Sequence, residues 1–552
     1  MKALKKALSF LLLFLFVFCT FSGCSHSANA KQITLSPNGK NDTDEFKNAI
    51  KNIKNGGTIE LKNGTYYLDG EIEIKSKSNI KVIGDNVIII RTGVELKGNR
   101  AENIKLFTFD ECENIKISGI TVKYDAVTSV SGVVTKSIPS SGQVVIKPNE
   151  NQNPKGNETY CALNTFDEYG NPDTKLEKYC NDGFSQTLGK DGTIFLGGLS
   201  FDEANLLTVG TRVGLRTSLS SDLAIKITNT KDIVFEDITI RNSFSGVFFT
   251  DGRTENLTLR RINISPEDNE NSYFSSNADG LHIAAIGGHL TVEDCTFIKL
   301  GDDCVNVHGA AYTVKNVDEK SVVGYHDRYN SPATTYWAQD GDEIEFYDKN
   351  SFKLLGSAIL KSINSVTGKM TFDKLPEGIK EGAIMANKTM HPTVTISNCT
   401  VKSNRARAFL LQTEGAVVKN CDISGTRLAA ILIAPDINYW YEMSPGRDIT
   451  ITDNVISNCG KGASTAIAID ASHDMNAFYS ADVNRNIVIK NNTFNNCVSA
   501  LKAASVNGLE FSNNTLNRLS GENVSYAVNY TRCANVTIGT NKLNNCNVLL
   551  SR

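Results

Sequence analysis

The sequence predicts an all-β protein, a right-handed parallel β-helix (solenoid) that carries two small inserted antiparallel β domains. Three observations predict this fold class. Short strands with alternating apolar residues recur at a nearly constant interval, an Asn or Asp stands at the corner that follows many of them, and no helical periodicity separates the copies. A repeat period of 20 to 50 residues indicates a solenoid, in which stacked turns share backbone hydrogen bonds and one narrow core.

The repeat is clearest where two copies follow each other directly. Asp232–Ile240 and Asn256–Ile264 share one pattern and begin 24 residues apart. In each copy, alternate apolar side chains point inward, and the corner residue tolerates left-handed backbone. Further copies are Leu290–Phe297, Val394–Val401, Ile449–Ile456, Ile487–Phe494 and Leu509–Leu516.

The first turns follow a short helix. Asn41–Ile50 has the pattern of a capped helix, and Gly56–Leu61 and Asn63–Tyr67 have the pattern of a first strand and turn. We expect the helix to cover the exposed end of the solenoid core. This opening resembles that of pectin-lyase-like β-helix proteins.

Two stretches without the repeat interrupt the solenoid. The first is rich in Ser, Gly, Pro and Asn turns, and the second contains Gly341–Tyr347 and Lys369–Phe372, which have the pattern of antiparallel hairpins. Both could protect sheet edges, and the second could also wall a groove, because it follows an acidic turn. The predicted parts are an N-terminal β-helix (32–124), an inserted β domain (125–221), a β-helix with catalytic turns (222–310), a second inserted β domain (311–388) and a C-terminal β-helix (389–552).

The N-terminus has the pattern of a secretion signal. Lys2, Lys5 and Lys6 precede an uncharged run, Leu8 to Phe21, that is too short to span a bilayer comfortably. Phe21-Ser22-Gly23-Cys24 resembles a bacterial lipoprotein box, which predicts a signal peptide over 1–24, lipidation at Cys24 and a linker over 25–31. Ala28-Asn29-Ala30 is an alternative cleavage site that would give a secreted protein. Either process places the protein outside the cytoplasm, and lipidation would make the membrane a partner.

Composition excludes some functions. The net charge is −3, with 57 basic and 60 acidic residues, which gives no basic footprint for nucleic acid. Of 13 cysteines, Cys19 and Cys24 belong to the leader, and an odd number remains. Most of the rest follow Asn or Asp at a repeat corner, which is typical of small buried thiols. Cys161 and Cys180 lie outside this pattern and could form one bridge. No CxxC or Cys/His metal spacing is present, and we expect no cofactor.

Two acidic clusters are the strongest functional signal. Asn277-Ala278-Asp279-Gly280 and Gly301-Asp302-Asp303 stand one repeat apart. One repeat along the sequence is one strand spacing, roughly 4.8 Å, in a coiled array of strands. We therefore expect three carboxylates on adjoining turns, with His282 and His308 similarly placed. Asp-Gly and Gly-Asp-Asp are also common turn formers, which is the structural alternative.

Carboxylates that share a groove can catalyse sugar hydrolysis. An inverting glycosidase needs an acid for the leaving oxygen and a base for water, with carboxyl groups about 6.5–9.5 Å apart. Side chains splayed from adjacent turns are expected to fit that distance. Close carboxylates also raise one another's pKa, so that one can keep its proton near neutral pH, and no external metal is needed.

The motifs resemble those of glycoside hydrolase family 110. They are Asn277–His282, Gly301–Gly309, Asn404–Arg407, Ala429–Ile433 and Tyr439–Glu442, and the resemblance covers roughly 222–470. The resemblance implies an exo-acting α-1,3-galactosidase that inverts configuration without a metal. Its partner would be a galactose-terminated oligosaccharide or glycoconjugate. It also implies that Asp302 is the acid and that Asp303 and Asp279 act on the water.

Several further residues are candidates for binding substrate. Trp440 and Glu442 could offer galactose a stacking face and a carboxylate, although this loop could simply pack on the solenoid. Arg405 and Arg407, if they lie on a strand, would share one side of it and one groove. His308 is expected to hydrogen-bond an Asp, and His282 could be either a site residue or structural.

Two other functions remain open. Polygalacturonases have a similar three-Asp arrangement, but their Gly-His-Gly and Arg-x-Lys motifs are replaced here by Val307-His308-Gly309 and Arg405-Ala406-Arg407. A polysaccharide lyase is disfavoured because no calcium-binding acidic group accompanies a catalytic Arg or Lys. A non-catalytic glycan-binding β-helix is the third possibility, although such a protein has no need of an acid–base pair.

Overall fold

The computed structural model describes residues 31–98, 100–218, 223–269, 271–470, 483–519 and 525–552. The expected signal peptide, Cys24 and the expected linker up to residue 30 lie outside the described residues. Within those residues, no helix has both the length and the apolar character needed to cross a membrane.

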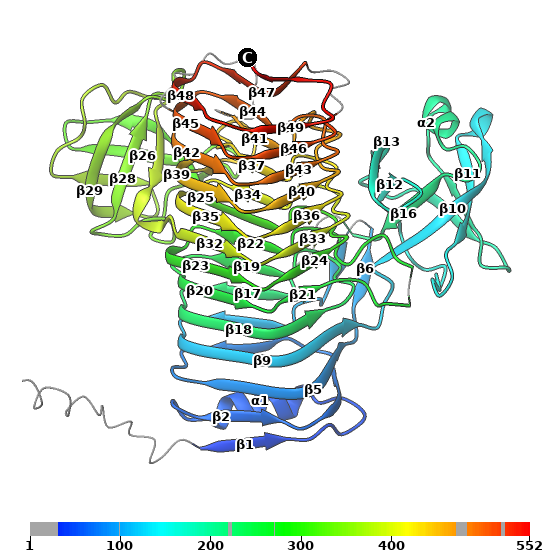
Figure 1. Cartoon of the computed structure of the whole chain (residues 1–552). Coiled ribbons are helices and arrows are strands. Elements are labelled where there is room, and N and C mark those ends of the chain that lie inside the picture. The colour runs from blue at the N-terminus through cyan, green and yellow to red at the C-terminus, as the bar shows by residue number, and fades with distance from the viewer. Residues whose placement is uncertain (1–30, 99, 219–222, 270, 471–482, 520–524) are drawn as a thin grey trace, which may run out of the picture.

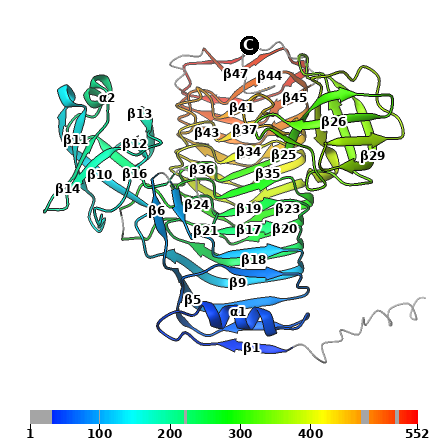
Figure 2. The same ribbon diagram turned by 180° about the vertical axis from the view of Figure 1, so that it is seen from behind.

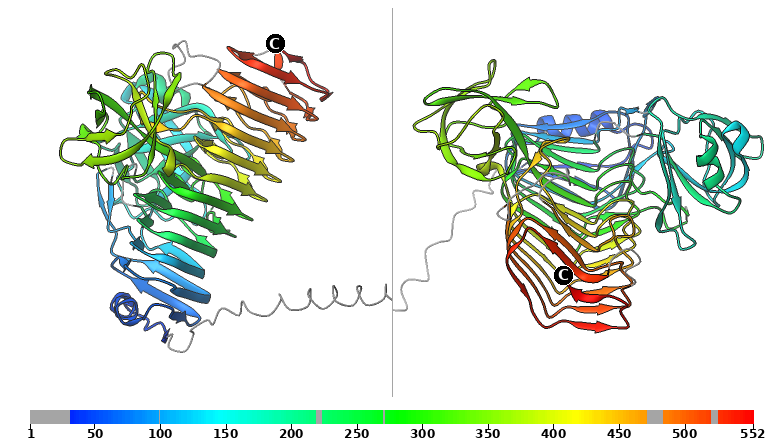
Figure 3. Two further views of the ribbon diagram at one scale, coloured as in Figure 1. Left: turned by 90° about the vertical axis from the view of Figure 1, so that its left-hand side faces the viewer. Right: turned by 90° about the horizontal axis from the view of Figure 1, so that it is seen from above.

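The chain winds into a stack of β-coils, which Figures 1 and 3 show from several sides. A typical coil has β32 (Thr393–Ser397), a corner, β33 (Thr400–Lys402), a turn and β34 (Phe409–Leu411). Strands such as β32 and β33 pair in parallel with their equivalents in the next coil and form one large sheet, while strands such as β34 form a second sheet. The predicted parallel β-helix is confirmed.

The large sheet runs the length of the stack. Besides β32 and β33, its strands are β1 (Gln32–Leu35), β2 (Thr58–Leu61), β3 (Gly64–Leu68), β5 (Lys81–Arg91), β9 (Glu113–Tyr124), β18 (Lys231–Ile240), β20 (Glu255–Arg260), β21 (Asn263–Ile264), β23 (Gly287–Glu293), β24 (Thr296–Ile298), β35 (Glu414–Lys419), β36 (Asp422–Ser424), β39 (Arg447–Thr452), β40 (Val455–Ser457), β42 (Asn484–Lys490), β43 (Thr493–Asn495), β45 (Val506–Ser512), β46 (Thr515–Asn517), β48 (Ala534–Ile538) and β49 (Lys542–Asn544).

The second sheet lies across the coil from the large one and supplies the floor of the candidate site. Besides β34, its strands are β4 (Ile72–Lys75), β8 (Phe107–Asp110), β17 (Ile225–Thr228), β19 (Phe248–Asp251), β22 (Leu281–Ala284), β25 (Val305–Val317), β37 (Ile431–Ile433), β41 (Ile467–Ile469), β44 (Leu501–Ala504), β47 (Tyr526–Thr531) and β50 (Leu549–Ser551).

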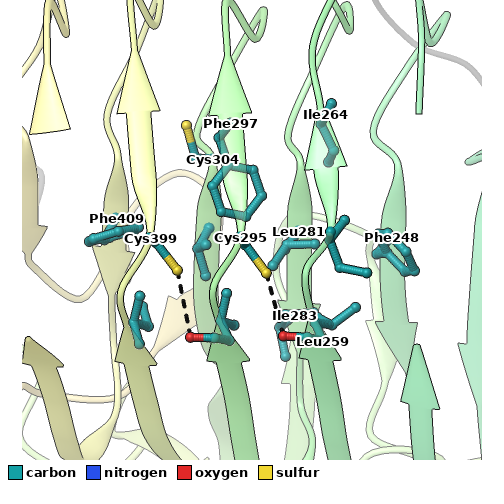
Figure 4. Close-up of a cluster of buried hydrophobic side chains, with 14 of the residues drawn as sticks. Phe248, Leu259, Ile264, Leu281, Ile283, Cys295, Phe297, Cys304, Cys399 and Phe409 are labelled. Atoms are coloured by element: carbon teal, nitrogen blue, oxygen red, sulfur yellow. Dashed lines mark hydrogen bonds between the residues drawn. The ribbon is translucent and has the colours of Figure 1, made fainter. Parts of the chain in front are cut away.

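Cysteines fill the core beside the coil corners, as the sequence predicted. Asn398 has φ of 56° at the corner between β32 and β33, and Cys399 directly after it is buried. Figure 4 shows the thiols of Cys399 and Cys295 pointing at carbonyl oxygens of the neighbouring coil, those of Val292 at 3.6 Å and Leu259 at 3.4 Å. These thiols are small core residues that also satisfy backbone acceptors.

Asparagines take over this corner position toward the C-terminus. The Oδ1 atom of Asn492 accepts the backbone N–H and the side-chain amide of Asn454, at 3.0 and 2.9 Å. Asn514 accepts from Asn492 in the same way, and Asn541 accepts from Asn514. The result is a buried ladder that satisfies polar groups turn by turn.

The N-terminal end is covered by α1 (Thr43–Asn52), whose Phe46, Ala49 and Ile50 are buried. Phe46 packs edge-on against Tyr66 at 5.5 Å. The expected helix is therefore present, with its start and end shifted by two residues.

The first inserted domain contains β10 (Ser129–Ile138), β11 (Gln143–Pro148), β12 (Ala162–Phe166), β13 (Pro172–Tyr179), β14 (Ser185–Leu188), β15 (Ile194–Gly197), α2 (Phe201–Leu206) and β16 (Arg212–Arg216), with a 3-10 turn at Pro139–Ser141. Its strands form an antiparallel sheet in the order β13-β12-β16-β10-β11-β15-β14. A separate ribbon pairs β6 (Glu95–Lys97) with β7 (Arg100–Glu102).

Cys161 and Cys180 in this domain are both free, so the suggested bridge between them is wrong. Their thiols instead point at the carbonyl oxygens of Arg216 and Gly183.

The second inserted domain is a small antiparallel barrel. Its pairings run from β25 through β26, β30, β29, β28 and β31 back to β25. The expected boundary at 311 falls inside β25, because one continuous strand leaves the solenoid and enters the barrel. The other elements of this domain are β26 (Ser321–His326), β27 (Ser331–Pro332), β28 (Glu343–Tyr347), β29 (Leu354–Asn364), β30 (Lys369–Phe372), β31 (Ile384–Asn387) and a 3-10 turn at Lys388–Met390. A later short strand, β38 (Glu442–Met443), follows β37 of the solenoid and pairs with β25.

Buried ion pairs fix the barrel to the solenoid. Arg253, which follows β19, binds both carboxylate oxygens of Asp342 at 2.7 and 3.0 Å. Arg447 on β39 donates to Glu345 at 3.0 Å and to the Tyr347 hydroxyl at 2.8 Å. The two inserted domains flank the stack on different sides (Figures 1 and 2).

The asparagine ladder predicts a cost for removing one of its members. Asn492→Ala should lower the free energy of unfolding by about 1–3 kcal/mol, because the buried amides of its neighbours lose their partner. Chemical denaturation followed by circular dichroism measures this. Lys502→Ala, at an exposed position of β44, is the control and should change stability by less than about 0.5 kcal/mol. Equal effects of the two substitutions would show that the ladder does not stabilise the fold.

Candidate active site

The register of the second sheet stacks three charged residues on consecutive coils. Leu281 of β22 pairs with Val305 of β25, and Val305 pairs with Phe409 of β34. Asp279, Asp303 and Arg407 each stand two residues before one of these paired positions. They therefore occupy equivalent places in the turns that enter the second sheet.

Glycines allow the turns to stack closely. A Cβ atom on Gly301 would lie 2.6 Å from the carbonyl group of Asn277, and one on Gly280 would lie 2.7 Å from the carbonyl oxygen of Cys304. Both distances are too short for a side chain, so glycine is required where the two acidic turns meet. The Gly residues in the two motifs are thus packing residues of the site.

The three aspartates form one cluster. The backbone N–H of Asp303 donates to Asp279 at 3.0 Å, and the nearest carboxylate oxygens of Asp279, Asp302 and Asp303 lie within 4.8 Å of one another. Nearest oxygens within 4.8 Å give only the closest approach of the three side chains, so the expected separation of about 6.5–9.5 Å between whole carboxyl groups stays a prediction. Asp279 turns toward the next coil, where it accepts this N–H.

Arg407 and Arg405 each bind one aspartate. The guanidinium of Arg407 reaches both oxygens of Asp303, at 3.0 and 3.2 Å, and its backbone N–H adds a third bond at 3.0 Å. Arg405 donates to Oδ1 of Asp302 at 3.0 Å. The Asp302 side chain is 42% exposed, whereas that of Asp303 is 5% exposed. Asp302 is thus the accessible carboxylate of the cluster.

Arg405 is held by the first inserted domain. Its Nη1 group donates to the carboxylate of Glu177 and, at 2.5 Å, to the hydroxyl of Tyr179, both on β13. Glu177 is also paired with Arg427 at 2.8 Å. This contact joins residues more than 200 positions apart, and sequence reasoning missed it because no motif marks Glu177.

Arg216 connects the same domain to the backbone of both acidic turns. Its buried guanidinium donates to the carbonyl oxygens of Asn277 at 2.8 Å and Gly301 at 3.3 Å. Arg216 ends β16, which lies between β12 and β10 in the sheet of the first inserted domain. The inserted domain therefore contributes to the position of all three aspartates.

Burial and charge set different pKa values in the cluster. Burial, opposed by Arg407 but reinforced by Asp302 and Asp279, raises the pKa of Asp303 to about 7. Burial also raises the pKa of Asp279, against the effect of its hydrogen bond from His282. Burial acts on Asp302 in the same direction, but the guanidinium groups of Arg405, Arg407 and Arg216 outweigh it and hold the pKa below its ordinary value.

The two candidate histidines face each other. His282 Nδ1 lies 2.7 Å from Oδ2 of Asp279, and its Nε2 lies 3.0 Å from Nε2 of His308. His308 Nδ1 lies 2.7 Å from the Gly309 carbonyl oxygen, to which it must donate. The prediction that His308 bonds an aspartate is wrong: His282 does so, because the ring of His308 turns toward its own backbone.

These contacts assign protonation states to the histidines. Burial disfavours a charge on His282, but the hydrogen bond and charge of Asp279 overcome it and raise the pKa to about 9. Burial lowers the pKa of His308, although Glu442 opposes this shift. We therefore assign a cationic His282 that donates from both nitrogens and a neutral His308 that accepts through Nε2.

A cavity of about 600 Å³ opens above these residues. Its floor is the outer face of the second sheet, where Phe249, His282, Asn306, Leu410 and Leu432 stand in one row across successive strands. One end holds the aspartate cluster and Arg407. The opposite wall is the inserted barrel, through Tyr312, His326, Tyr329, Tyr336 and Trp337.

A segment after β37 closes a further side of the cavity and brings in Trp440 and Glu442. Glu442 is fixed by pairing of β38 with Ala310 on β25. Its Oε2 accepts from Asn306 at 3.4 Å and its Oε1 lies 3.7 Å from His308 Nε2. Trp440 is half-exposed at the rim, where the guanidinium of Arg328 lies 4.0 Å from its ring centroid. Tyr441 between them adopts φ of 59°, a strained conformation that turns both neighbours toward the cavity.

Eight of the nine predicted site residues border the cavity: Asp279, Asp302, Asp303, His282, His308, Arg407, Trp440 and Glu442. Arg405 does not line it. The condition under which Arg405 and Arg407 would share one side of a strand is not met, because both lie in the turn before β34 and bind different partners.

The structure adds cavity residues that the sequence did not indicate. Asn306, Gln412 and Asp436 are buried, and Asn306 Oδ1, Gln412 Oε1 and Asp436 Oδ2 have no hydrogen-bond partner among the described residues. Buried polar atoms normally have partners, so these atoms are available to a polar ligand. Asn306 could have been found from the sequence, since it stands one strand over from His282 in the repeat.

The assigned protonation of His282 can be tested directly. NMR of histidine labelled at Cε1 should show one ring, absent in His282→Gln, that titrates near pH 9. In Asp279→Asn that ring should titrate at a lower pH, because burial is then opposed only by the charges of Glu442 and Asp303. A ring that titrates at the same pH in both proteins would rule out the Asp279–His282 pair.

Two family models match parts of the chain. One, described as the right handed beta helix region, matches residues 381–550, and the other, glycosyl hydrolases family 28, matches residues 215–325. The second match contains all three aspartates and two of the cavity histidines, His282 and His308.

Two named relatives are similar to part of this chain. Alpha-1,3-galactosidase B of Bacteroides thetaiotaomicron is 25% identical over 374 residues, which cover 63% of this chain and 59% of the relative. Alpha-1,3-galactosidase A of Akkermansia muciniphila is 30% identical over 207 residues, 36% of this chain and 34% of the relative. The chain thus spans less than two thirds of the length of each.

One solved structure that matches most of this chain is the catalytic domain of a GH87 alpha-1,3-glucanase in complex with tetrasaccharides. It has a TM-score of 0.49 and 10% identity, and the match covers 95% of this chain and 66% of that one. The family models support the β-helix fold and the likeness to glycoside hydrolases, and the named relatives make the chain similar to α-1,3-galactosidases over part of its length.

Proposed function

We propose that the protein is an extracytoplasmic, exo-acting glycoside hydrolase that releases terminal α-1,3-linked galactose with inversion of configuration. The observation that carries this proposal is the cluster of Asp279, Asp302 and Asp303 at one end of a walled cavity of sugar size. The names of the relatives supply the sugar and the linkage.

The charges of the cavity favour a neutral sugar. Its described lining contains six carboxylates, and Arg407 is the one Lys or Arg among those residues. Arg407 is already paired with Asp303, and the cationic His282 is already paired with Asp279. A galacturonate carboxylate would enter this site without an unpaired cation and against like charge, which is unfavourable. Galactose brings hydroxyl groups that can donate hydrogen bonds to the carboxylates.

The walls of the cavity support attack on a chain end. The barrel and the segment that carries Trp440 close the sides away from the aspartates. A terminal sugar fits between these walls with its anomeric carbon at the acidic cluster and its glycosidic oxygen next to the exposed Asp302. The aromatic rings of the wall offer apolar faces of the kind on which sugars stack.

Proton transfer then follows from the positions of the carboxyl groups. Asp302 gives its proton to the glycosidic oxygen as the bond from that oxygen to the anomeric carbon breaks. A water molecule between Asp279 and Asp303 loses a proton to them and attacks the anomeric carbon from the opposite face. Asp302 is left as a carboxylate, which Arg405 stabilises, and the proton gained from water restores it for the next cycle.

Before this reaction, a proton must move from Asp303 to Asp302 in the sugar-free site. Asp303, with a pKa of about 7, is the aspartate that holds a proton most readily, whereas Asp302 is ionised by its arginines. A bound sugar removes water from the exposed Asp302, which raises the pKa of that carboxyl. The nearest oxygens of the two residues are within 4.8 Å, so one water can relay the proton.

The short carboxylate separation also permits a second stereochemical course. Retaining glycosidases have carboxyl groups only about 5–5.5 Å apart. Inversion is favoured here because Asp303 is bound at both oxygens by Arg407 and is poorly placed to attack carbon.

The family 28 match supports one alternative, a polygalacturonase-like hydrolase. It requires the same aspartates but an anionic substrate, which the cavity charges disfavour.

We also propose that Cys24 is lipidated and anchors the protein to the outer face of a membrane. The pattern Phe21-Ser22-Gly23-Cys24 supports this, with cleavage after Ala30 as the alternative. Metabolic labelling with a fatty acid analogue, lost in Cys24→Ala, tests the anchor.

The catalytic roles can be separated with two leaving groups. The unmodified protein should release galactose from an α-1,3-galactosyl disaccharide and nothing from polygalacturonate. Asp302→Asn should lower kcat on the disaccharide by about 10²- to 10⁴-fold, and much less on an aryl galactoside whose leaving group needs no proton. Asp303→Asn should lower both rates alike. The reverse pattern would make Asp303 the acid, and turnover of polygalacturonate alone would replace the proposed substrate.

The stereochemical course has its own test. Proton NMR of the first sugar formed should show β-galactose, which mutarotation later converts to a mixture. An α-product at the earliest times would establish retention and assign a nucleophile to the cluster.

A further inference from the structure

We propose that His282, His308 and Glu442 form a binding site for a divalent transition metal ion, for which Zn²⁺ is the best match. The three side chains come from β22, β25 and β38, and they offer two imidazole nitrogens and one carboxylate oxygen within 4.8 Å of one another. Two histidines with one carboxylate and an open fourth position are a common set for zinc.

The distances fit an ion placed between the three groups. The two Nε2 atoms lie 3.0 Å apart, and His308 Nε2 lies 3.7 Å from Oε1 of Glu442. Zinc bonds of about 2.0–2.2 Å in a tetrahedron place neighbouring ligand atoms about 3.3–3.5 Å apart. These two distances need shifts of only a few tenths of an ångström, and the third, between His282 and Glu442, is within 4.8 Å.

The outer partners of the ligands match those of metal sites. The second nitrogen of His282 is bonded to Asp279, and that of His308 is bonded to the Gly309 carbonyl oxygen. Oε2 of Glu442 accepts from Asn306. A carboxylate or carbonyl behind each ligating histidine fixes its tautomer and orientation. Here these bonds leave Nε2 of both histidines and Oε1 of Glu442 close to one another on the inner side of the three groups.

The surroundings select the type of metal. The His308 and Glu442 side chains are 8% and 14% exposed, so the ligands cannot easily turn away. Imidazole ligands favour zinc, copper and nickel over magnesium and calcium, which prefer sets made of oxygens. The neighbouring aspartate cluster is a poorer candidate, because Arg405 and Arg407 already occupy two of its carboxylates.

A proton can take the place of the metal. In the metal-free chain, a hydrogen on His282 Nε2 satisfies the contact with His308. The resemblance implies that turnover needs no metal, so we expect the proton-bearing form to be the one that binds sugar. Metal bound at Glu442 and His282 would then compete with galactose, a consequence that rests on the proposed function. Binding of the metal itself does not rest on it.

Titration of the chelator-treated protein with Zn²⁺ alone tests the site. Calorimetry should show one ion per chain, and His308→Gln and Glu442→Gln should weaken binding by roughly 100-fold or more. His289→Gln removes an exposed histidine on β23 and should leave binding unchanged. No binding to the unmodified protein, or equal binding to all variants, would overturn the proposal.

A second measurement does not depend on the affinity of the variants. Co²⁺ should give the unmodified protein the visible absorption of a tetrahedral site with nitrogen and oxygen ligands, and Zn²⁺ should raise its thermal midpoint. Unchanged spectra and midpoints would contradict the site, and circular dichroism shows whether each variant is folded. Failure of galactose release with intact metal binding would count against the proposed function alone.

Discussion

The parallel register between coils is the constraint on which the candidate site depends. The backbone hydrogen bonds between β22, β25 and β34 also fix the turns that enter these strands. Asp279, Asp303 and Arg407 are therefore stacked by the strand register and not by their own side-chain contacts. A slip of one residue would reverse the direction of every side chain in the sheet. The buried apolar positions of each strand prevent this, because the same residues that build the core hold the register. Stability and chemistry therefore rest on the same set of hydrogen bonds.

The two inserted domains complete what the repeat cannot supply. A coil offers one short turn and one outward strand face, which is a flat surface rather than a pocket. The barrel raises a wall of aromatic rings beside that face, while the first inserted domain holds the acidic turns from the other side through Arg216 and Glu177. Buried ion pairs such as Arg253–Asp342 keep the wall in place. The site lies where a regular scaffold meets irregular domains, which agrees with the general separation of scaffold and function.

The sequence was informative where a residue's neighbours follow from the repeat. Alternation and corner residues predicted the β-helix, the buried cysteines and the meeting of Asp279 with Asp302 and Asp303, because each follows from a period along the chain. Glu177, Arg216 and Tyr312 could not be found in this way, since their positions depend on how non-repeating domains dock. The contacts of the carboxylates could not be predicted for another reason: strand spacing fixes backbones, but the N–H of Asp303 decides where the Asp279 side chain points.

The charge balance of the cluster explains why a proton stays in it. Asp303 has an acidic neighbour on either side and one cation, Arg407, so complete ionisation would place three close carboxylates at the edge of a partly buried cavity. Asp279 shares its charge with His282, and Asp302 shares its charge with Arg405. Arg407 alone does not offset the burial of Asp303 and its two acidic neighbours, so the pKa of that carboxyl stays raised. A site built in this way retains a mobile proton near neutral pH between a fixed anion and an exposed one, which is the condition that acid–base chemistry on a neutral sugar requires.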